Sequence, residues 1–273
     1  MKTARVNGVV LEYEVSGSGE PVLLISPVLS DGFVPLVAEP ALADNHELIR
    51  YHKRGWVGST HRPGPVSIAE HAADAAALLD HLGIERAHIA GHSSGAAVAI
   101  QLALDAPARV QTVTLLELSL LSLTEGQAFL QQATPVLEAY GNGDHEGAFA
   151  MFMAAVSGME WPACRALLDE RIPGQVQQAI KDADTFFGVE LPALAGWTFG
   201  PDQAAAIRQP VLSVVGSDTA PLWVAVAAFL RTAIPDVEEC TIDGVGHLLH
   251  IQQSEPVARA IADFANRHRI GAR

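Results

Sequence analysis

Apolar and polar residues alternate at the start of the chain. The alternation runs from Arg5 to Val15, and Asn7-Gly8 interrupts it. An Asn-Gly pair between two alternating runs is typical of a tight turn that joins antiparallel strands. Farther along, Val22 to Ile25 form a continuous apolar run, which is typical of a strand buried on both faces of a parallel sheet. The pattern therefore predicts a hairpin followed by an interior strand.

The pattern then switches repeatedly between strand and helix periods. Ser67-Ile68-Ala69-Glu70 has the spacing of a helical capping box, and apolar residues recur on one helical face from there to Gly83. A further helix is expected at 94–104, and strands are expected at 47–51, 87–90 and 110–116. Strands and helices that alternate at this interval predict right-handed βαβ units around a parallel sheet.

A long helical stretch interrupts this alternation. Residues 118–206 are rich in Ala, Leu, Gln, Met and Phe, and prolines and glycines divide them into segments. Strand patterns return at 210–216 and 237–242, and helices are expected at 222–234 and 255–269. We therefore expect an α/β core made of residues 1–117 and 207–273, with a helical cap, residues 118–206, inserted into it.

Composition and charge narrow the classes of function. Hydrophobic residues make up 49% of the 273 residues and charged residues 18%, which is typical of a compact globular protein. The formal net charge of −14 disfavours nucleic acid or an anionic membrane surface as a partner and favours a neutral or apolar small molecule. No apolar run reaches the roughly 18 residues of a membrane span, and no signal-peptide core follows Met1. The expected location is the cytoplasm.

The metal-binding side chains show no ligand pattern. Cys164 and Cys240 stand far apart, without the spacing of a zinc site or a disulfide framework, so both are expected to be reduced structural thiols. His247 and His250 are three residues apart, but no third ligand accompanies them. We expect neither a metal nor a cofactor.

The strongest chemical signal is a serine between glycines. Ser93 is the centre of Gly91-His92-Ser93-Ser94-Gly95, which follows the predicted strand that ends in His88-Ile89-Ala90 and precedes a predicted helix. This strand-turn-helix setting is that of a nucleophile elbow, in which the serine has a strained backbone and side chains beside it would clash. The alternative is an ordinary glycine-serine turn. The setting favours Ser93 as a nucleophile, with His92 projecting away from it.

A serine hydroxyl needs a base and a group that orients the base. His247 stands in Gly244-Val245-Gly246-His247, a turn after the last predicted strand, at the sheet edge that presents Ser93. The alternative role is that of a loop histidine bonded to backbone. Two carboxylates compete for the orienting role, because Glu117 and Asp218 both follow predicted strands. For the oxyanion hole, the expected N–H donors are Ser94 and Val28, since Pro27 has no N–H.

Taken in order, these motifs resemble the α/β-hydrolase superfamily across essentially the whole chain. The matching segments are Leu23 to Val28, Arg54 to Ser59, Gly91 to Gly95 and Gly244 to His247. One departure is Ser26-Pro27, which replaces the usual His-Gly of the oxyanion loop. The resemblance implies attack by serine on a carbonyl, an acyl-enzyme, and hydrolysis of that intermediate by water.

The resemblance also bears on the acid. In most superfamily members the acid stands three residues after a glycine, at the end of the strand that follows the cap. Counted from Gly216, this position is Thr219. Asp218 lies one residue early. A carboxylate at the position of Glu117 is the acid in a subset that includes zearalenone-type lactone hydrolases, which also have a Ser-Ser-Gly elbow. The expected triad is therefore Ser93, His247 and Glu117.

Hydrolysis of a carboxylic ester or lactone is the preferred function. A serine nucleophile disfavours haloalkane dehalogenases and epoxide hydrolases, which are similar in fold but use aspartate. The alternatives are carbon–carbon bond hydrolysis, perhydrolase or haloperoxidase activity on the same triad, and a non-catalytic small-molecule receptor. Some of the large apolar residues of the predicted cap are expected to line an apolar pocket over Ser93: Phe129, Phe149, Phe152, Met153, Trp161, Phe186, Phe187 and Trp197.

Overall fold

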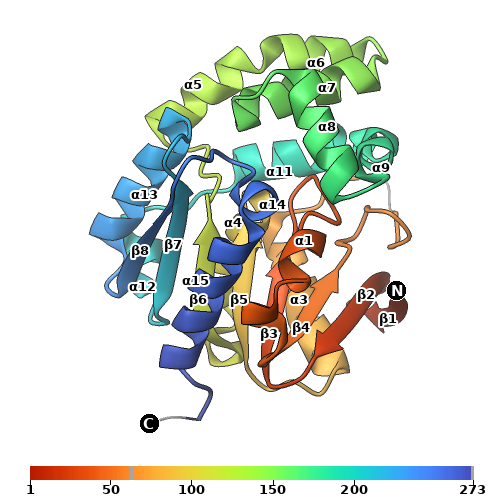
Figure 1. Cartoon of the computed structure of the whole chain (residues 1–273). Coiled ribbons are helices and arrows are strands. Elements are labelled where there is room, and N and C mark those ends of the chain that lie inside the picture. The colour runs from red at the N-terminus through yellow and green to blue at the C-terminus, as the bar shows by residue number, and fades with distance from the viewer. Residues whose placement is uncertain (62–63, 272–273) are drawn as a thin grey trace.

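An eight-stranded sheet forms the centre of the molecule (Figure 1). The computed structural model describes residues 1–61 and 64–271. The strands lie in the order β1-β2-β4-β3-β5-β6-β7-β8, and pairing is antiparallel from β1 to β4 and parallel from β4 to β8. Their bounds are β1 Lys2–Val6, β2 Val9–Gly17, β3 Glu20–Ile25, β4 His46–Tyr51, β5 Ala87–His92, β6 Val110–Leu116, β7 Val211–Gly216 and β8 Val237–Ile242. The expected α/β-hydrolase sheet is confirmed.

The opening hairpin turns at the predicted Asn-Gly pair. Asn7 and Gly8 have φ angles of 44° and 74°, and Val6 pairs with Val9 across the turn. Positive φ at both central residues matches the twist of the two strands, and asparagine and glycine adopt it at the lowest cost. The hairpin therefore forms one edge of the sheet, joined to it through the pairing of β2 with β4.

Successive side chains of the central strands pack into two separate apolar layers, one on each face of the sheet. Leu23, Ile89 and Leu115 belong to the layer on one face, and Leu24 and Leu116 belong to the layer on the other. Since successive side chains of a strand point to opposite faces, a continuous apolar run fits a strand that is covered on both sides. The first layer contains helices α3 Ile68–His81, α4 Ser94–Asp105 and α13 Pro221–Ala233, and the second contains α1 Val34–Val37, α2 Pro40–Ala43, α14 Leu249–Gln252 and α15 Ser254–Arg267.

A group of helices connects β6 to β7 and lies over one end of the sheet (Figure 1). Its members are α5 Thr124–Gln132, α6 Thr134–Gly141, α7 His145–Ser157, α8 Trp161–Arg171, α9 Gln175–Lys181, α10 Ala183–Thr185, the π-helix η2 Phe186–Glu190 and α11 Leu191–Gly196. Strands β3, β5 and β6 end beneath these helices, and the loops that follow them face the same pocket. The last helix before β7, α12 Pro201–Ala206, packs against α13 beside the sheet (Figure 1).

Short elements were not predicted. The helices α1, α2 and α14 have four residues each, the turn η1 Pro107–Arg109 has three, and η2 departs from the α-helical period. Such segments are too short to establish a periodic pattern, so tertiary packing decides them. Strand β5 extends to His92, beyond the predicted end at Ala90, because Gly91 and His92 still pair with β6. Among the described residues, no helix is both long enough and apolar enough to cross a membrane.

Candidate active site

Ser93 forms the sharp turn between β5 and α4. Its backbone has φ 56° and ψ −118°, a strained conformation for a residue with a side chain. A Cβ on Gly91 would lie 2.3 Å from the Gly95 carbonyl oxygen, and one on Gly95 would lie 2.0 Å from the Ile25 carbonyl oxygen. Only glycine therefore fits at these two positions, two residues before and two residues after Ser93. The turn has the geometry that the sequence predicted for a nucleophile elbow.

A second hydroxyl contacts Ser93. The Oγ atoms of Ser93 and Ser119 are 2.9 Å apart, and the backbone N–H of Ser119 lies 3.3 Å from the Ser93 carbonyl oxygen that accepts it. Ser119 is buried and lines the same pocket. Sequence reasoning missed this residue, because a serine in the loop after a strand belongs to no motif.

His247 and Glu117 meet at the carboxyl edge of the sheet. His247 Nδ1 lies 2.7 Å from Glu117 Oε2, and both side chains are buried. The other oxygen, Oε1, accepts the Gly216 N–H at 2.9 Å, and the Glu117 backbone has a positive φ of 46°. A carboxylate is an acceptor only, so the proton of the neutral imidazole lies on Nδ1 and the Nε2 lone pair is left to accept another.

Asp218 lies elsewhere. Its carboxylate is exposed and accepts the hydroxyl of Ser217 at 2.9 Å, and its backbone N–H donates to the Val245 carbonyl at 3.0 Å. The structure thus brings Glu117, and not Asp218, to His247. The one-residue offset that separates Asp218 from the usual position of the acid directs its carboxylate to solvent.

Aromatic rings pack around His247. The Trp223 ring stacks on it with 3.8 Å between centroids, and the His92 ring lies 4.5 Å away on centroids. His92 Nε2 donates to the His247 carbonyl at 2.9 Å, which fits the expected structural role of His92. Burial lowers the pKa of His92 well below its usual value and that of His250 to about 3, so both rings are neutral at neutral pH. Of these three rings, His247 is the one that contacts a carboxylate.

The two expected oxyanion donors face the pocket. Ser94 is the first residue of α4, where backbone N–H groups have no partner within the helix. Val28 follows β3 across the pocket and is buried. A helix N-terminus also carries partial positive charge, which favours a developing negative charge beside it.

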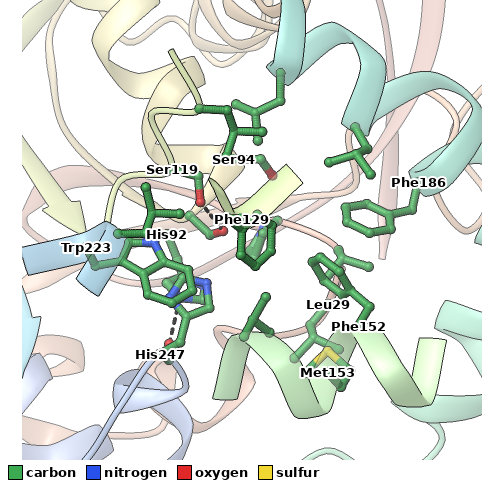
Figure 2. Close-up of a pocket in the computed structure, with 18 of the residues that line it drawn as sticks. Leu29, His92, Ser94, Ser119, Phe129, Phe152, Met153, Phe186, Trp223 and His247 are labelled. Atoms are coloured by element: carbon green, nitrogen blue, oxygen red, sulfur yellow. Dashed lines mark hydrogen bonds between the residues drawn. The ribbon is translucent and has the colours of Figure 1, made fainter. Parts of the chain in front are cut away.

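The pocket itself is apolar. Figure 2 shows Trp223 beside His247 on one side and Phe152, Met153 and Phe186 on the other. The complete lining is Pro27, Val28, Leu29, His92, Ser93, Ser94, Ser119, Leu121, Phe129, Phe152, Met153, Val156, Phe186, Leu191, Leu194, Leu222, Trp223, His247 and Leu248. Among the described residues that line it, the two histidines are the only ones with an acidic or basic side chain. The site therefore suits a neutral, apolar molecule with one polar reacting group.

Half of the large residues of the predicted cap reach this pocket. Phe129, Phe152, Met153 and Phe186 line it. The others pack against neighbouring rings, as in the edge contact of Phe149 with Trp161 and the stacking of Trp197 on Phe199. Trp223, on α13, was not predicted. Its spacing on an amphipathic helix is that of an ordinary core residue.

The chain is similar to known hydrolases in sequence and fold. The family model described as "alpha/beta hydrolase fold" matches residues 30–254. A protein named "Putative carbamate hydrolase RutD" from Azorhizobium caulinodans is 30% identical over 249 residues, 87% of this chain and 88% of that protein. The structure of an esterase from Thermogutta terrifontis has a TM-score of 0.82 and 23% identity, covering 98% of this chain and all of that chain. Est816, an N-acyl homoserine lactone degrading enzyme, has a TM-score of 0.75 and 25% identity, covering 96% of this chain and all of that chain.

Proposed function

We propose that this chain, which belongs to the α/β-hydrolase family and is a hydrolase, cleaves a carboxylic ester or lactone through an acyl-enzyme. The observation that carries the proposal is the 2.7 Å contact of His247 Nδ1 with the buried carboxylate of Glu117. It leaves His247 Nε2 able to accept a proton in a pocket that also contains Ser93. We assign Ser93 as the nucleophile, His247 as the base and Glu117 as the acid that orients it.

In the proposed mechanism, Ser93 Oγ attacks the substrate carbonyl carbon while His247 Nε2 takes the hydroxyl proton. The N–H groups of Ser94 and Val28 stabilise the oxyanion, and Glu117 stabilises the imidazolium. Collapse of the tetrahedral intermediate expels the alkoxide, which takes the proton from His247. Water, deprotonated by His247, then attacks the acyl-enzyme, and the acid leaves as Ser93 regains its proton.

The hydroxyl of Ser93 pairs with Ser119 in the structure. Hydrogen bonds of a catalytic group are often completed only when substrate binds. We propose that at that stage the Ser93 hydroxyl directs its proton to His247 instead of to Ser119. The nearness of Ser119 supports this step, because a hydroxyl can donate to Ser93 Oγ and leave the Ser93 proton directed at the base.

The apolar lining supports a substrate whose acyl or alcohol part is hydrophobic. Residues 118–206 contribute most of the large apolar side chains of the lining, among them Phe129, Phe152 and Phe186, and we propose that they act as a cap over a core of residues 1–117 and 207–273. The relative named for carbamate hydrolysis supports including carbamates among the substrates to be tested. A carbamate presents the same kind of electrophilic carbonyl to the serine.

The nucleophile assignment is tested with a fluorophosphonate probe and a substrate panel. Wild-type protein should be labelled at Ser93 and should hydrolyse members of a panel of p-nitrophenyl esters, aliphatic and aromatic lactones, and aryl carbamates. Ser93→Ala should not be labelled and should lose about 10⁴-fold or more in turnover, the usual cost of losing a triad member. The far-ultraviolet circular dichroism and Tm of the variant should match those of wild type.

Each of the other outcomes would favour a different interpretation of the site. Labelling of folded wild type with no hydrolysis of the panel would favour carbon–carbon bond hydrolysis or perhydrolase chemistry on the same serine. Folded wild type that is not labelled would favour a small-molecule receptor. Unchanged hydrolysis by Ser93→Ala would refute the elbow assignment.

A further inference from the structure

A buried ion pair lies directly behind the elbow and has no part in the mechanism above. Lys53 follows β4, and its Nζ lies 2.7 Å from Oε1 of Glu190, the last residue of the π-helix η2. The side chains of Lys53 and Glu190 are 3% and 1% exposed. Moving an ion pair this far from water costs free energy, so its presence requires a reason in geometry or function.

The carboxylate of Glu190 reaches the elbow through Ser94. Ser94 Oγ donates to Glu190 Oε1 at 2.5 Å, and Trp56 Nε1 donates to Oε2 at 2.9 Å. Glu190 therefore accepts from three donors, two in the loop after β4 and one at the start of α4. One of them is the residue whose backbone N–H we assign to the oxyanion hole.

We propose that Glu190 and Lys53 are positioning residues of the oxyanion hole: Glu190 anchors Ser94 through its hydroxyl, and Lys53 cancels the charge of Glu190 beside the developing oxyanion. The inference rests on the proposed function, because it takes Ser93 as nucleophile and Ser94 as donor.

The anchoring has a clear physical basis. An oxyanion hole works because its donors are already oriented before charge develops, so any freedom at Ser94 raises the barrier. Ser94 begins α4 next to the strained residue Ser93, and no earlier helical turn holds it. A hydrogen bond from its side chain to a carboxylate that two other groups also hold restricts its motion. Short π-helical segments are frequent at functional sites, and η2 is the element that delivers Glu190.

The charge balance follows from the same contacts. An unpaired carboxylate one side chain away from the Ser94 N–H would repel the oxyanion, and the repulsion is strong in a dry interior. Lys53 binds the same oxygen, Oε1, that accepts from Ser94, and so offsets that charge where it matters most. Burial raises the pKa of Glu190, but Lys53 and the hydrogen bonds outweigh this and hold it below the usual value, so the carboxylate is charged.

The other groups near Glu190 are neutral. Tyr51, on β4, and His71, on α3, both interact with it electrostatically. Burial lowers the pKa of His71 to about 3 and raises that of the Tyr51 phenol far above its usual value. Neither gains or loses charge between about pH 5 and about pH 9 in the wild-type protein. Since Lys53 also contributes to the low pKa of His71, the double variant, which lacks the Glu190 carboxylate, assigns a new ionisation after loss of Lys53 to Glu190.

The charge is tested with Lys53→Met and the double variant Lys53→Met with Glu190→Gln, using kcat for the best ester of the panel. Without Lys53, burial raises the pKa of Glu190, which is neutral below that pKa and charged above it. In Lys53→Met, kcat should therefore fall by about tenfold as pH rises. This loss is smaller than the roughly 10²-fold to 10³-fold loss that follows removal of a whole oxyanion-hole donor. The double variant carries neither charge, so its alkaline loss should disappear and its kcat should return to within about threefold of wild type.

The anchor is tested with Glu190→Ala against Glu190→Gln. The glutamine oxygen can still accept from Ser94, whereas alanine removes the acceptor. Glu190→Ala should lower kcat by about tenfold at every pH with KM changed less than about threefold, and Glu190→Gln should retain most of kcat. This comparison also stands if Lys53→Met does not fold.

The matched control is Asp74→Asn. Asp74 forms another buried ion pair, with Arg54 Nε at 2.6 Å, and does not contact the elbow. The Asp74→Asn substitution should lower Tm while leaving the kcat of the folded protein and its pH profile as in wild type. The inference is overturned if Lys53→Met behaves in the same way, if the double variant shows no recovery, or if Glu190→Ala and Glu190→Gln have equal kcat. Inactive, unlabelled wild type would instead refute the proposed function.

Discussion

At the scale of single residues, the geometry distinguishes most clearly between the two carboxylates that compete for the role of the acid. Glu117 directly follows β6 and has a left-handed backbone, and its two oxygens contact His247 Nδ1 and the Gly216 N–H. The strained backbone is compensated by these two bonds, one of which involves the base of the proposed triad. Asp218, the competing carboxylate, is exposed on the following strand end.

We predict that Glu117→Gln lowers kcat/KM by about 10²-fold to 10⁴-fold, because an amide offers His247 the wrong tautomer and does not stabilise the imidazolium. Asp218→Asn should keep kcat/KM within about threefold of wild type. The measurement is steady-state hydrolysis of the best ester by both variants. A severe loss in Asp218→Asn with an active Glu117→Gln would transfer the role of acid to the later strand.

The serine pair makes a second prediction at this scale. Ser119→Ala removes the hydroxyl that lies 2.9 Å from the Ser93 hydroxyl, and it leaves all three residues of the proposed triad unchanged. We expect kcat to fall about threefold to tenfold with little change in KM, which is the worth of one hydrogen bond. Ser119→Thr, which retains the hydroxyl, should restore most of kcat. An equal loss in both variants would show that packing, rather than the hydroxyl, accounts for the effect.

At the scale of elements, the approach of α4 to the sheet determines where the elbow stands. The Ile25 carbonyl at the end of β3 leaves no room for a side chain at Gly95, and the Gly95 carbonyl leaves none at Gly91. The two glycines are therefore required by the packing of helix against strand. Strand ends, helix start and proposed oxyanion loop thus form one compact unit.

We predict that Gly95→Ala lowers the free energy of unfolding by about 2 kcal/mol or more, since a Cβ 2.0 Å from a backbone oxygen forces strand and helix apart. Chemical denaturation measures the change. Gly141→Ala, at the end of α6, meets no atom within 4 Å and is the control, with an expected change of less than about 0.5 kcal/mol. Similar losses in the two variants would contradict the close packing at the elbow.

The helices over the site make the second prediction at this scale. The pocket at Ser93 has a cavity of about 30 Å³, while a neighbouring pocket between α5, α7 and α13 has about 280 Å³. Phe129, Phe152 and Leu222 line both. A cavity of the smaller size holds little more than a water molecule or two, so a larger substrate must displace this wall.

We predict that Phe129→Ala joins the two pockets and raises kcat/KM for long-chain p-nitrophenyl esters relative to acetate by about tenfold. Wild type should already prefer apolar acyl groups to short, charged ones, because the lining is apolar. The control is Phe229→Ala, which removes a half-buried ring of α13 that packs against Phe199 and lines neither pocket. An unchanged chain-length profile in Phe129→Ala would exclude the wall as a determinant of substrate size.

At the scale of the whole molecule, the sheet brings together residues that are far apart in the chain. His247 and Glu117 are 130 positions apart, and Ser94 and Glu190 are 96 apart. Parallel strands place their carboxyl ends at one edge, so loops after β3, β5, β6 and β8 converge on a single pocket. Helices inserted after β6 cover that edge and complete its apolar lining.

Most of the fold follows from local patterns in the sequence. The Asn7-Gly8 turn, the capping box at Ser67, the apolar run of β3 and the strand pattern of β6 each occur in the structure, because each depends on residues close together in the chain. The elbow was predictable from the motif Gly91 to Gly95, and the close contact of Gly91 with the Gly95 carbonyl is local, although the contact that requires glycine at Gly95 is with the distant Ile25 carbonyl.

Other features were decided by tertiary structure. The sequence left Glu117 and Asp218 as competing carboxylates, and only the packing of β6 beside β7 brings one of them to His247. It gave no sign of Ser119, nor of the bond between Lys53 and Glu190, because these contacts join segments whose separation is unrelated to any local period. Local sequence determines elements through short-range sterics and burial, whereas contacts between distant side chains depend on how the finished elements pack.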